Sequence, residues 1–141
     1  MILTDVNILI YAFRTDAADH RRYKEWLESV VSGPETYAVA PQVLSSFVRI
    51  VTHPRIFVHP SRLEDALEFA KILLEQSCAV LALPQENHWA IFEKLCRESA
   101  AAGNLVQDAW FAALAIESGC EWITVDRDYS RFPGLRWRAP F

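Results

Sequence analysis

Two aspartates stand where a folded chain can bring acidic side chains together for chemistry. Asp5 directly follows the short apolar run at residues 2–4, and Asp126 follows a second apolar run at residues 122–125. Both runs are predicted to be strands of a parallel sheet, in which functional sites form beyond the carboxyl ends of the strands. If these two strands are neighbours, the two carboxylates converge at one edge of the sheet.

A third aspartate, Asp108, lies in the helix predicted over residues 105–118. Asn104 is predicted to be the N-cap of this helix, with Gln107 in the position of a capping box, so Asp108 lies about one turn into it. The residues that share its face have small side chains: Ala112, Ala115 and Gly119. A face of small side chains lets a helix lie close to a sheet, and this would carry Asp108 toward the other two acids.

Each acid also has an ordinary structural explanation. Asp108 can be an acid stabilised by the helix dipole, and Asp5 can cap a short turn that contains Asn7. Asp126 and Asp128, in the segment TVDRDY, can simply form a turn. These explanations weaken when the acids are considered together, because three carboxylates at one place repel each other unless something compensates their charge.

A divalent cation is the natural compensation for such a cluster. Mg²⁺ prefers oxygen ligands, keeps several waters, and needs only one or two protein carboxylates and a substrate phosphate. The ion can orient and deprotonate water and stabilise an in-line phosphoryl displacement. The acids are therefore compatible with nuclease chemistry, whereas none of the four histidines lies near a recognisable nucleophile motif.

Short apolar strands that alternate with helices surround these residues. The pattern predicts right-handed βαβ units, and hence an α/β fold with a parallel sheet covered by helices on both faces. Strands are expected at 2–4, 37–39, 79–83 and 122–125, with an edge strand at 135–137. A helical turn is expected at 7–11, and helices at 19–31, 42–51, 61–76, 87–102 and 105–118, where Ser61 would cap the helix at 61–76.

Length and composition indicate one compact domain. The chain has 141 residues, 52% of them hydrophobic, and a net charge of −4. The overall negative charge gives no indication of a nucleic-acid partner. The three cysteines are widely spaced and form no CxxC pair, which favours buried free thiols in a reducing cytosol. The apolar N-terminal stretch lacks a basic leader and is too short to cross a bilayer, so a cytoplasmic location without membrane insertion is expected.

Four segments, in this order, resemble the PIN-domain family and, more closely, the VapC-type ribonuclease toxins of bacterial toxin–antitoxin pairs. They are MILTDVNILIYAF at the start, SFVRIVTHPRIF from 46, GNLVQDAWFAALAIESG from 103 and ITVDRDYSRFPGL from 123. The resemblance covers essentially the whole chain, so residues 1–141 are identified as a single PIN domain. It implies a three-layer α/β/α fold, dependence on Mg²⁺ or Mn²⁺, and cleavage of RNA, often tRNA, which inhibits translation. It also implies a homodimer that a VapB-like antitoxin neutralises.

The resemblance assigns roles residue by residue. Asp5 and Asp108 are similar to the principal metal ligands of the family, and Asp126 to a further acid of the site. Asp128 would contribute through water or fix the turn. Asn7 and Thr124 resemble the polar residues that orient these carboxylates.

One position departs from the family pattern. Many PIN domains have a glutamate on the helix after the second strand, where this chain has Ser45 and Ser46. A single Mg²⁺ can still be held by two carboxylates and water, but a second metal is put in doubt. Arg49, on the same helix face as Ser46, and Arg55 are candidates for RNA phosphate contacts, and equally for salt bridges with surface glutamates.

Two other functions compete with a metal-dependent endoribonuclease. The missing glutamate is compatible with a catalytically weakened PIN-like module that acts by binding RNA or an antitoxin. The D-x-D motif at residues 126–128 also suggests a small phosphohydrolase. This last interpretation is the weakest, because the motif normally follows the first strand of such enzymes, where this chain has D-x-N.

Overall fold

The computed structural model describes residues 1–141 and contains one five-stranded sheet with six α-helices. All strand pairs are parallel, in the order β3-β2-β1-β4-β5. The strands are β1 (Ile2–Thr4), β2 (Tyr37–Val39), β3 (Ala79–Leu81), β4 (Glu121–Ile123) and β5 (Trp137–Arg138). The helices are α1 (Val6–Phe13), α2 (His20–Val31), α3 (Pro41–Val51), α4 (Leu63–Leu74), α5 (His88–Ser99) and α6 (Asn104–Glu117), and a 3₁₀ turn, η1, follows β4 at Arg127–Arg131.

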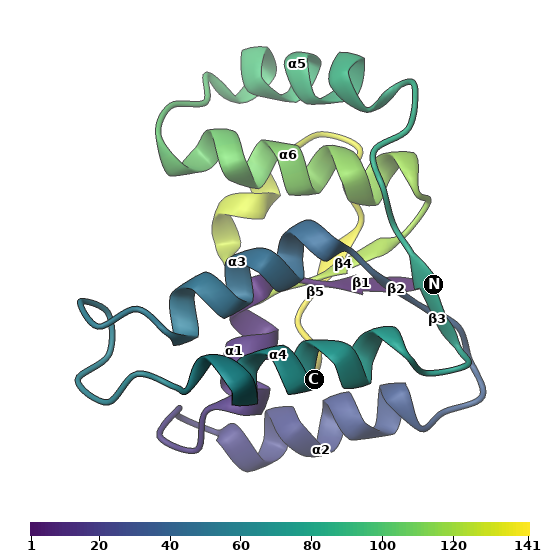
Figure 1. Ribbon diagram of the computed structural model, residues 1–141. Coiled ribbons are helices and arrows are strands. Elements are labelled where there is room, and N and C mark those ends of the chain that lie inside the picture. Colours follow the sequence, from purple (N-terminus) through teal and green to yellow (C-terminus); the bar gives the residue numbers. More distant parts are fainter.

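The helices lie in two layers, so the predicted three-layer α/β/α architecture is confirmed. Figure 1 shows α5 and α6 stacked on one side of the sheet, and α1, α2 and α4 on the other. The chain first builds outward from β1 to β2 and β3, and then returns across β1 to add β4 and β5. This reversal places a topological switch point between β1 and β4, which is where open α/β sheets bind ligands.

The β1–β4 pairing brings the two ends of the chain together. Thr4 is in register with Ile123, and the backbone N–H of Asp5 donates to the carbonyl oxygen of Ile123 at 2.9 Å. The expected neighbourhood of Asp5 and Asp126 is therefore confirmed. β1 runs from the N-terminus, at the right of Figure 1, toward α1, so both strands end on the left-hand side of that view.

Alanines let α6 approach the sheet closely. Ala109, Ala112, Ala113 and Ala115 of this helix have no exposed surface and belong to the main hydrophobic core. A row of such small side chains brings the helix axis near the strands without leaving voids. The small face predicted around Asp108 is thus a packing face, and Asp108 stands at its end nearest the switch point.

Several predicted boundaries are wrong, including the end of α5, which lies at Ser99 rather than at residue 102. α6 begins at Asn104 rather than after it, because Gly103 occupies the N-cap with φ 59°, a conformation that favours glycine. Ser61 does not cap α4, which begins at Leu63, since its hydroxyl instead accepts a hydrogen bond from Arg14. β5 starts two residues later than predicted.

The expectation that all three cysteines are buried is correct only for Cys120. Cys78 and Cys96 are half-buried, and all three are free thiols.

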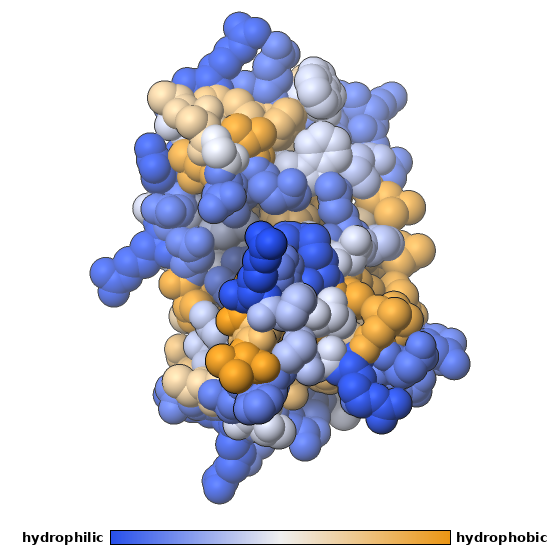
Figure 2. Space-filling view, turned by 60° about the vertical axis from the view of Figure 1, so that its left-hand side comes forward, coloured by the Kyte–Doolittle hydropathy of each residue, from blue (hydrophilic) through white to orange (hydrophobic).

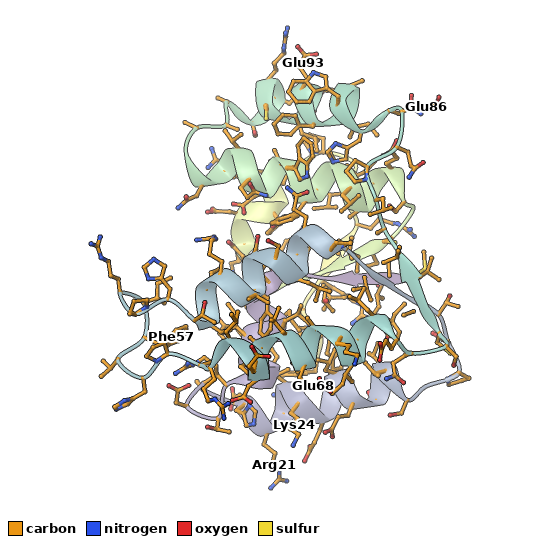
Figure 3. The ribbon with its side chains drawn as sticks, viewed as in Figure 1. Arg21, Lys24, Phe57, Glu68, Glu86 and Glu93 are labelled. Atoms are coloured by element: carbon orange, nitrogen blue, oxygen red, sulfur yellow. The ribbon has the colours of Figure 1, made fainter.

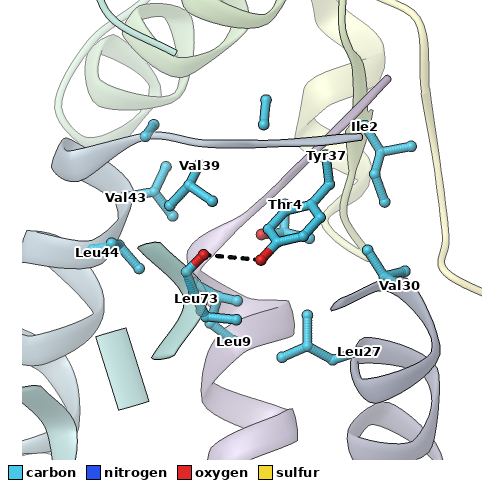
Figure 4. Close-up of a pocket in the computed structure, with 12 residues that line it drawn as sticks. Ile2, Thr4, Leu9, Leu27, Val30, Tyr37, Val39, Val43, Leu44 and Leu73 are labelled. Atoms are coloured by element: carbon cyan, nitrogen blue, oxygen red, sulfur yellow. Dashed lines mark hydrogen bonds between the residues drawn. The ribbon is translucent and has the colours of Figure 1, made fainter. Parts of the chain in front are cut away.

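The centre of the other helical layer is apolar and nearly filled. A cavity of about 20 Å³ lies between β2 and the helices α2 and α4, and all but one of its lining residues are hydrophobic. Figure 4 shows the one hydrogen bond drawn there, from the Tyr37 hydroxyl to the carbonyl oxygen of Leu73, at 2.9 Å. A void of this size holds one water at most and has few polar partners for it, so it is a core defect rather than a ligand site. No helix is both long enough and apolar enough to cross a bilayer.

Candidate active site

The predicted acids line one pocket of about 540 Å³ at the switch point. Asp5 comes from the end of β1, Asp108 from the first turns of α6, and Asp126 and Asp128 from the segment after β4. The lining also includes Asn7, Ser46 and Arg49 of the predicted site, together with Val6, Ile10, Ile50, Ile56, Asn104, Gln107 and Phe111. The fold therefore brings together nearly all of the side chains that the sequence singled out.

Asp5 is held in place by two hydrogen bonds. One carboxylate oxygen accepts from the backbone N–H of Val6 at 2.7 Å, so Asp5 is the N-cap of α1 as well as a site residue. The other accepts from the Thr124 hydroxyl at 2.5 Å, across 119 residues of sequence. Asp5 is only 6% exposed, so its position is determined by these two donors rather than by solvent.

The Thr124 hydroxyl connects three parts of the site. It donates its single proton in a hydrogen bond to Asp5, and its oxygen accepts hydrogen bonds from the Asn7 amide at 3.3 Å and from the backbone N–H of Asp126 at 3.0 Å. Because a hydroxyl has one proton and two lone pairs, this arrangement is complete. It also requires Asn7 to turn its NH₂ group toward Thr124, and the buried Asn7 Oδ1 is left without a hydrogen-bond partner.

Burial and mutual repulsion make the charged forms of the acids unfavourable. Burial raises the pKa of Asp5 to about 7, although the Thr124 and Val6 hydrogen bonds oppose the shift and the charges of Asp108 and Asp126 add to it. Burial and the charge of Asp126 raise the pKa of Asp108 to about 6. Such shifts occur where like charges are gathered for function, and a bound cation would reverse them.

Tyr129 is a site residue that the sequence did not reveal. It lies on η1, is 1% exposed, and its hydroxyl donates to Asp108 at 3.4 Å. Burial and the neighbouring carboxylates keep the pKa of Tyr129 far above its ordinary value, so the phenol stays a neutral donor. The sequence signal that could have revealed Tyr129 is its spacing of three residues from Asp126, because one turn of 3₁₀ helix brings a residue at that spacing back under the acids.

The donor set fits a hydrated hard cation. Carboxylate and amide oxygens are the ligands that Mg²⁺ prefers, and the unpartnered Asn7 Oδ1 is one more oxygen acceptor at the pocket. No group of three or more carboxylate, imidazole or thiol side chains is placed to hold a metal ion. Coordination of a metal ion by Asp5, Asp108 and Asp126 therefore stays a prediction.

The two predicted arginines differ in their positions. Arg49 lies on α3 one turn after Ser46, and both line the pocket. Arg55 is exposed, follows the end of α3, and is not among the lining residues. Neither arginine forms a salt bridge, so the alternative of a pairing with surface glutamates has no support in the structure.

Comparison with known proteins identifies the family. The family model of the PIN domain matches residues 2–135. The chain belongs to the PIN domain family. This PIN domain is 38% identical over 140 residues to a VapC ribonuclease of Mycobacterium bovis, an alignment that covers 99% of this chain and 95% of the relative. It is 35% identical to ribonuclease VapC25 of Mycobacterium tuberculosis, with 99% of each chain covered.

Solved structures share the fold of this PIN domain. VapBC2 from Rickettsia felis, bound to a DNA fragment from its promoter, superposes with a TM-score of 0.71 at 21% identity, covering 99% of this chain and 98% of that one. VapC20 of Mycobacterium tuberculosis, a toxin that cleaves the sarcin-ricin loop, gives a TM-score of 0.66 at 19% identity, covering 96% and 99%. The family match does not favour the phosphohydrolase interpretation.

Proposed function

We propose that the protein is a metal-dependent endoribonuclease and the toxin of a type II toxin–antitoxin pair. The observation that carries this proposal is the convergence of Asp5, Asp108, Asp126 and Asp128 in one pocket of a PIN domain. The relatives that match over 99% of the chain are named as VapC ribonucleases. The structural neighbours include VapBC complexes, which supports a VapB-like antitoxin as the partner.

Mg²⁺, or Mn²⁺ in its place, would be held by Asp5 and Asp108, with Asp126 as a further acid and Asp128 acting through water. When bound, such an ion lowers the pKa of water and neutralises charge on the phosphate. Thr124 and the α1 N-terminus orient Asp5, and Tyr129 donates to Asp108. With Ser46 at the place of the usual glutamate, the donor set supports one metal rather than two.

The remaining residues position the RNA. Arg49 is the only basic residue that lines the pocket, and its guanidinium can contact a phosphate beside the acids. Asp126 is half-buried, and one of its carboxylate oxygens accepts from the backbone N–H of Asp128 at 2.8 Å, which leaves the other free to accept from an attacking water. Arg55, exposed beyond the pocket, would contact the RNA backbone farther from the cleaved bond.

Metal-dependent cleavage of RNA tests the proposal. The purified protein should cut a pool of total tRNA and ribosomal RNA when Mg²⁺ or Mn²⁺ is present, and the cutting should stop when EDTA removes the ion. Products sequenced at single-nucleotide resolution would identify the RNA, with tRNA as the expected class and inhibition of translation as the consequence. A homodimer neutralised by the antitoxin is expected, and light scattering with and without the antitoxin checks it.

The missing glutamate favours one alternative, a weakened module that binds RNA or antitoxin without cleaving. Calorimetric titration with Mn²⁺ separates the two functions. A competent site should bind the ion in a manner that depends on Asp5 and Asp108, whereas the weakened module should show no such binding. Absence of such metal binding, together with absence of RNA cleavage, would support the alternative.

Thr124→Val should lower kcat/KM for RNA cleavage by about 10- to 100-fold, because the valine keeps the shape of the side chain but releases Asp5, Asn7 and the Asp126 backbone together. Thr124→Ser is the matched control, since it retains the hydroxyl and should keep most of the activity. Initial rates and melting temperatures of both variants check this. Full activity in the valine variant would show that the hydroxyl does not organise the site.

A further inference from the structure

The acidic pocket has an apolar side that metal chemistry does not use. Ile10 of α1, Ile50 of α3 and Ile56 of the loop between α3 and α4 line it, and we call these three residues the aliphatic shelf. Ile56 is 52% exposed, although it is a large hydrophobic residue. Figure 2 brings this side of the molecule forward and shows hydrophilic and hydrophobic side chains gathered next to one another.

The pocket is larger than a metal site requires. Its volume is about 540 Å³. A fully hydrated ion, with about six waters of about 30 Å³ each, fills less than half of such a volume. The whole pocket also lies within the range of roughly 300–1,000 Å³ that is typical of pockets for small organic ligands. There is room for a nucleotide as well as an ion.

The loop that carries Ile56 is held firmly by Arg14, which is 7% exposed at the end of α1. The Arg14 guanidinium donates to the Ser61 hydroxyl and to the carbonyl oxygen of His59, each at 3.0 Å, and lies 3.7 Å from the centre of the Phe57 ring. Asp16 binds the same guanidinium through two hydrogen bonds. Figure 3 shows Phe57 on this loop, at the left of the molecule.

Backbone bonds hold the loop tip as well. The carbonyl oxygen of His53 accepts from the N–H groups of Ile56 and Phe57, both at 3.1 Å, and the His53 ring accepts from the N–H of Arg55 at 3.0 Å. α1 thus carries Asp5 at one end and the arginine that anchors the loop at the other. The exposed isoleucine is therefore preorganised beside the acids, which lowers the entropic cost of binding a ligand there.

We propose that the aliphatic shelf binds an unpaired nucleobase of the RNA next to the cleaved phosphate. This inference rests on the proposed ribonuclease function and adds a subsite to it. A nucleobase is flat and uncharged, so it can pack on isoleucine side chains while its phosphate lies between Arg49 and the acids. The exposed amides of Asn104 and Gln107 line the same pocket and can bond to base edges, as proteins do when they read bases splayed out of single-stranded RNA.

Ile56→Ala is the direct test of the shelf. KM for a short single-stranded RNA that contains the cleavage site should rise about ten-fold while kcat stays within about two-fold, because apolar contact is lost without touching the acids. Val58→Ala is the matched control, since Val58 belongs to the same loop, is 90% exposed and does not line the pocket. Its KM should equal that of the unmodified protein. Both side chains are exposed, so both variants should fold.

Abasic substitutions show whether a base is the group that is bound. An abasic nucleotide is placed in turn at each position beside the cleaved bond, and each RNA is assayed with the unmodified protein and with Ile56→Ala. At one position the abasic change should raise KM for the unmodified protein and have almost no further effect on the variant, because both changes remove the same contact.

If the effects of the abasic nucleotide and of Ile56→Ala on KM are additive at every position, or if Ile56→Ala leaves KM unchanged, the nucleobase subsite is overturned. The proposed ribonuclease function would still stand, because the unmodified protein would still cleave RNA. Loss of affinity for the antitoxin alone, measured by calorimetry with the same variant, would overturn the nucleobase subsite too and assign the shelf to the antitoxin. Absence of RNA cleavage by the unmodified protein would instead remove the ribonuclease function on which the subsite rests.

Discussion

Asp108→Asn is expected to lower the rate of RNA cleavage by roughly 100- to 1,000-fold and, at the same time, to stabilise the fold. Activity should fall because the amide carries no charge to hold a cation or to complement the phosphate during cleavage. Stability should rise at pH 8, because burial and the charges of Asp126 and Asp128 make the Asp108 carboxylate unfavourable, as its pKa of about 6 shows. The gain should be on the order of 1 kcal/mol in the free energy of unfolding, since part of the group is open to solvent.

Cleavage rates at saturating Mg²⁺ and urea unfolding curves without metal measure the two effects separately. Glu68→Gln is a suitable control, because Glu68 is an exposed acid on α4 without a salt bridge and lies outside the pocket. It should change neither quantity. Unchanged cleavage by Asp108→Asn would contradict the proposed function, and a marked loss of stability would show that Asp108 serves packing instead.

Without divalent cations, the free energy of unfolding is expected to fall as the pH rises from about 4 to about 8. The pKa of Asp5 is about 7 in the folded protein, against the ordinary value of 3.8, so between these values the folded state binds more protons than the unfolded state. Stability is therefore greatest below pH 4 as far as this group is concerned, and is lost as the pH rises through 7. At about 1.4 kcal/mol for each pH unit, the full change is on the order of 4 kcal/mol.

Mg²⁺ or Mn²⁺ should restore most of this stability at pH 8, because the ion binds the charged carboxylates of the folded state only. A concentration 100-fold above the dissociation constant corresponds to about 2.7 kcal/mol. Asp5→Asn should flatten both the pH dependence and the metal response, while its amide oxygen can still cap α1. Melting temperatures over the pH range, with EDTA or with metal, check this. A pH profile that is equally steep in the variant would assign the titration to other groups.

Much of the fold followed from local patterns. The apolar runs at residues 2–4 and 37–39 are strands, and the alanine-rich segment before Gly119 is a packed helix. The boundary of α6 was wrong because Asn104 is a good cap by type, yet Gly103 alone suits the positive φ that the chain needs there. Asn104 is consequently left free to line the pocket.

The candidate site was predictable where the acids follow strands, and not where distant side chains meet. Asp5 and Asp126 were placed by the rule that parallel strands end at one edge of the sheet. Tyr129 and the anchoring role of Arg14 were missed, because a buried tyrosine or arginine looks like any other residue until its partners are known. Arg55, whose type and spacing suggested a contact at the site, lies outside the pocket.

By itself, the sequence determined which acids stand at the ends of strands and helices, because strand pattern, capping and small-residue spacing are local properties. Only the tertiary structure decided that Thr124 bonds to Asp5 across 119 residues, that Tyr129 lies under Asp108, and that Ile56 faces the same pocket as the acids. These contacts depend on which strands pair and which faces become buried together. That choice is made by the packing of the whole core, and no short segment contains it.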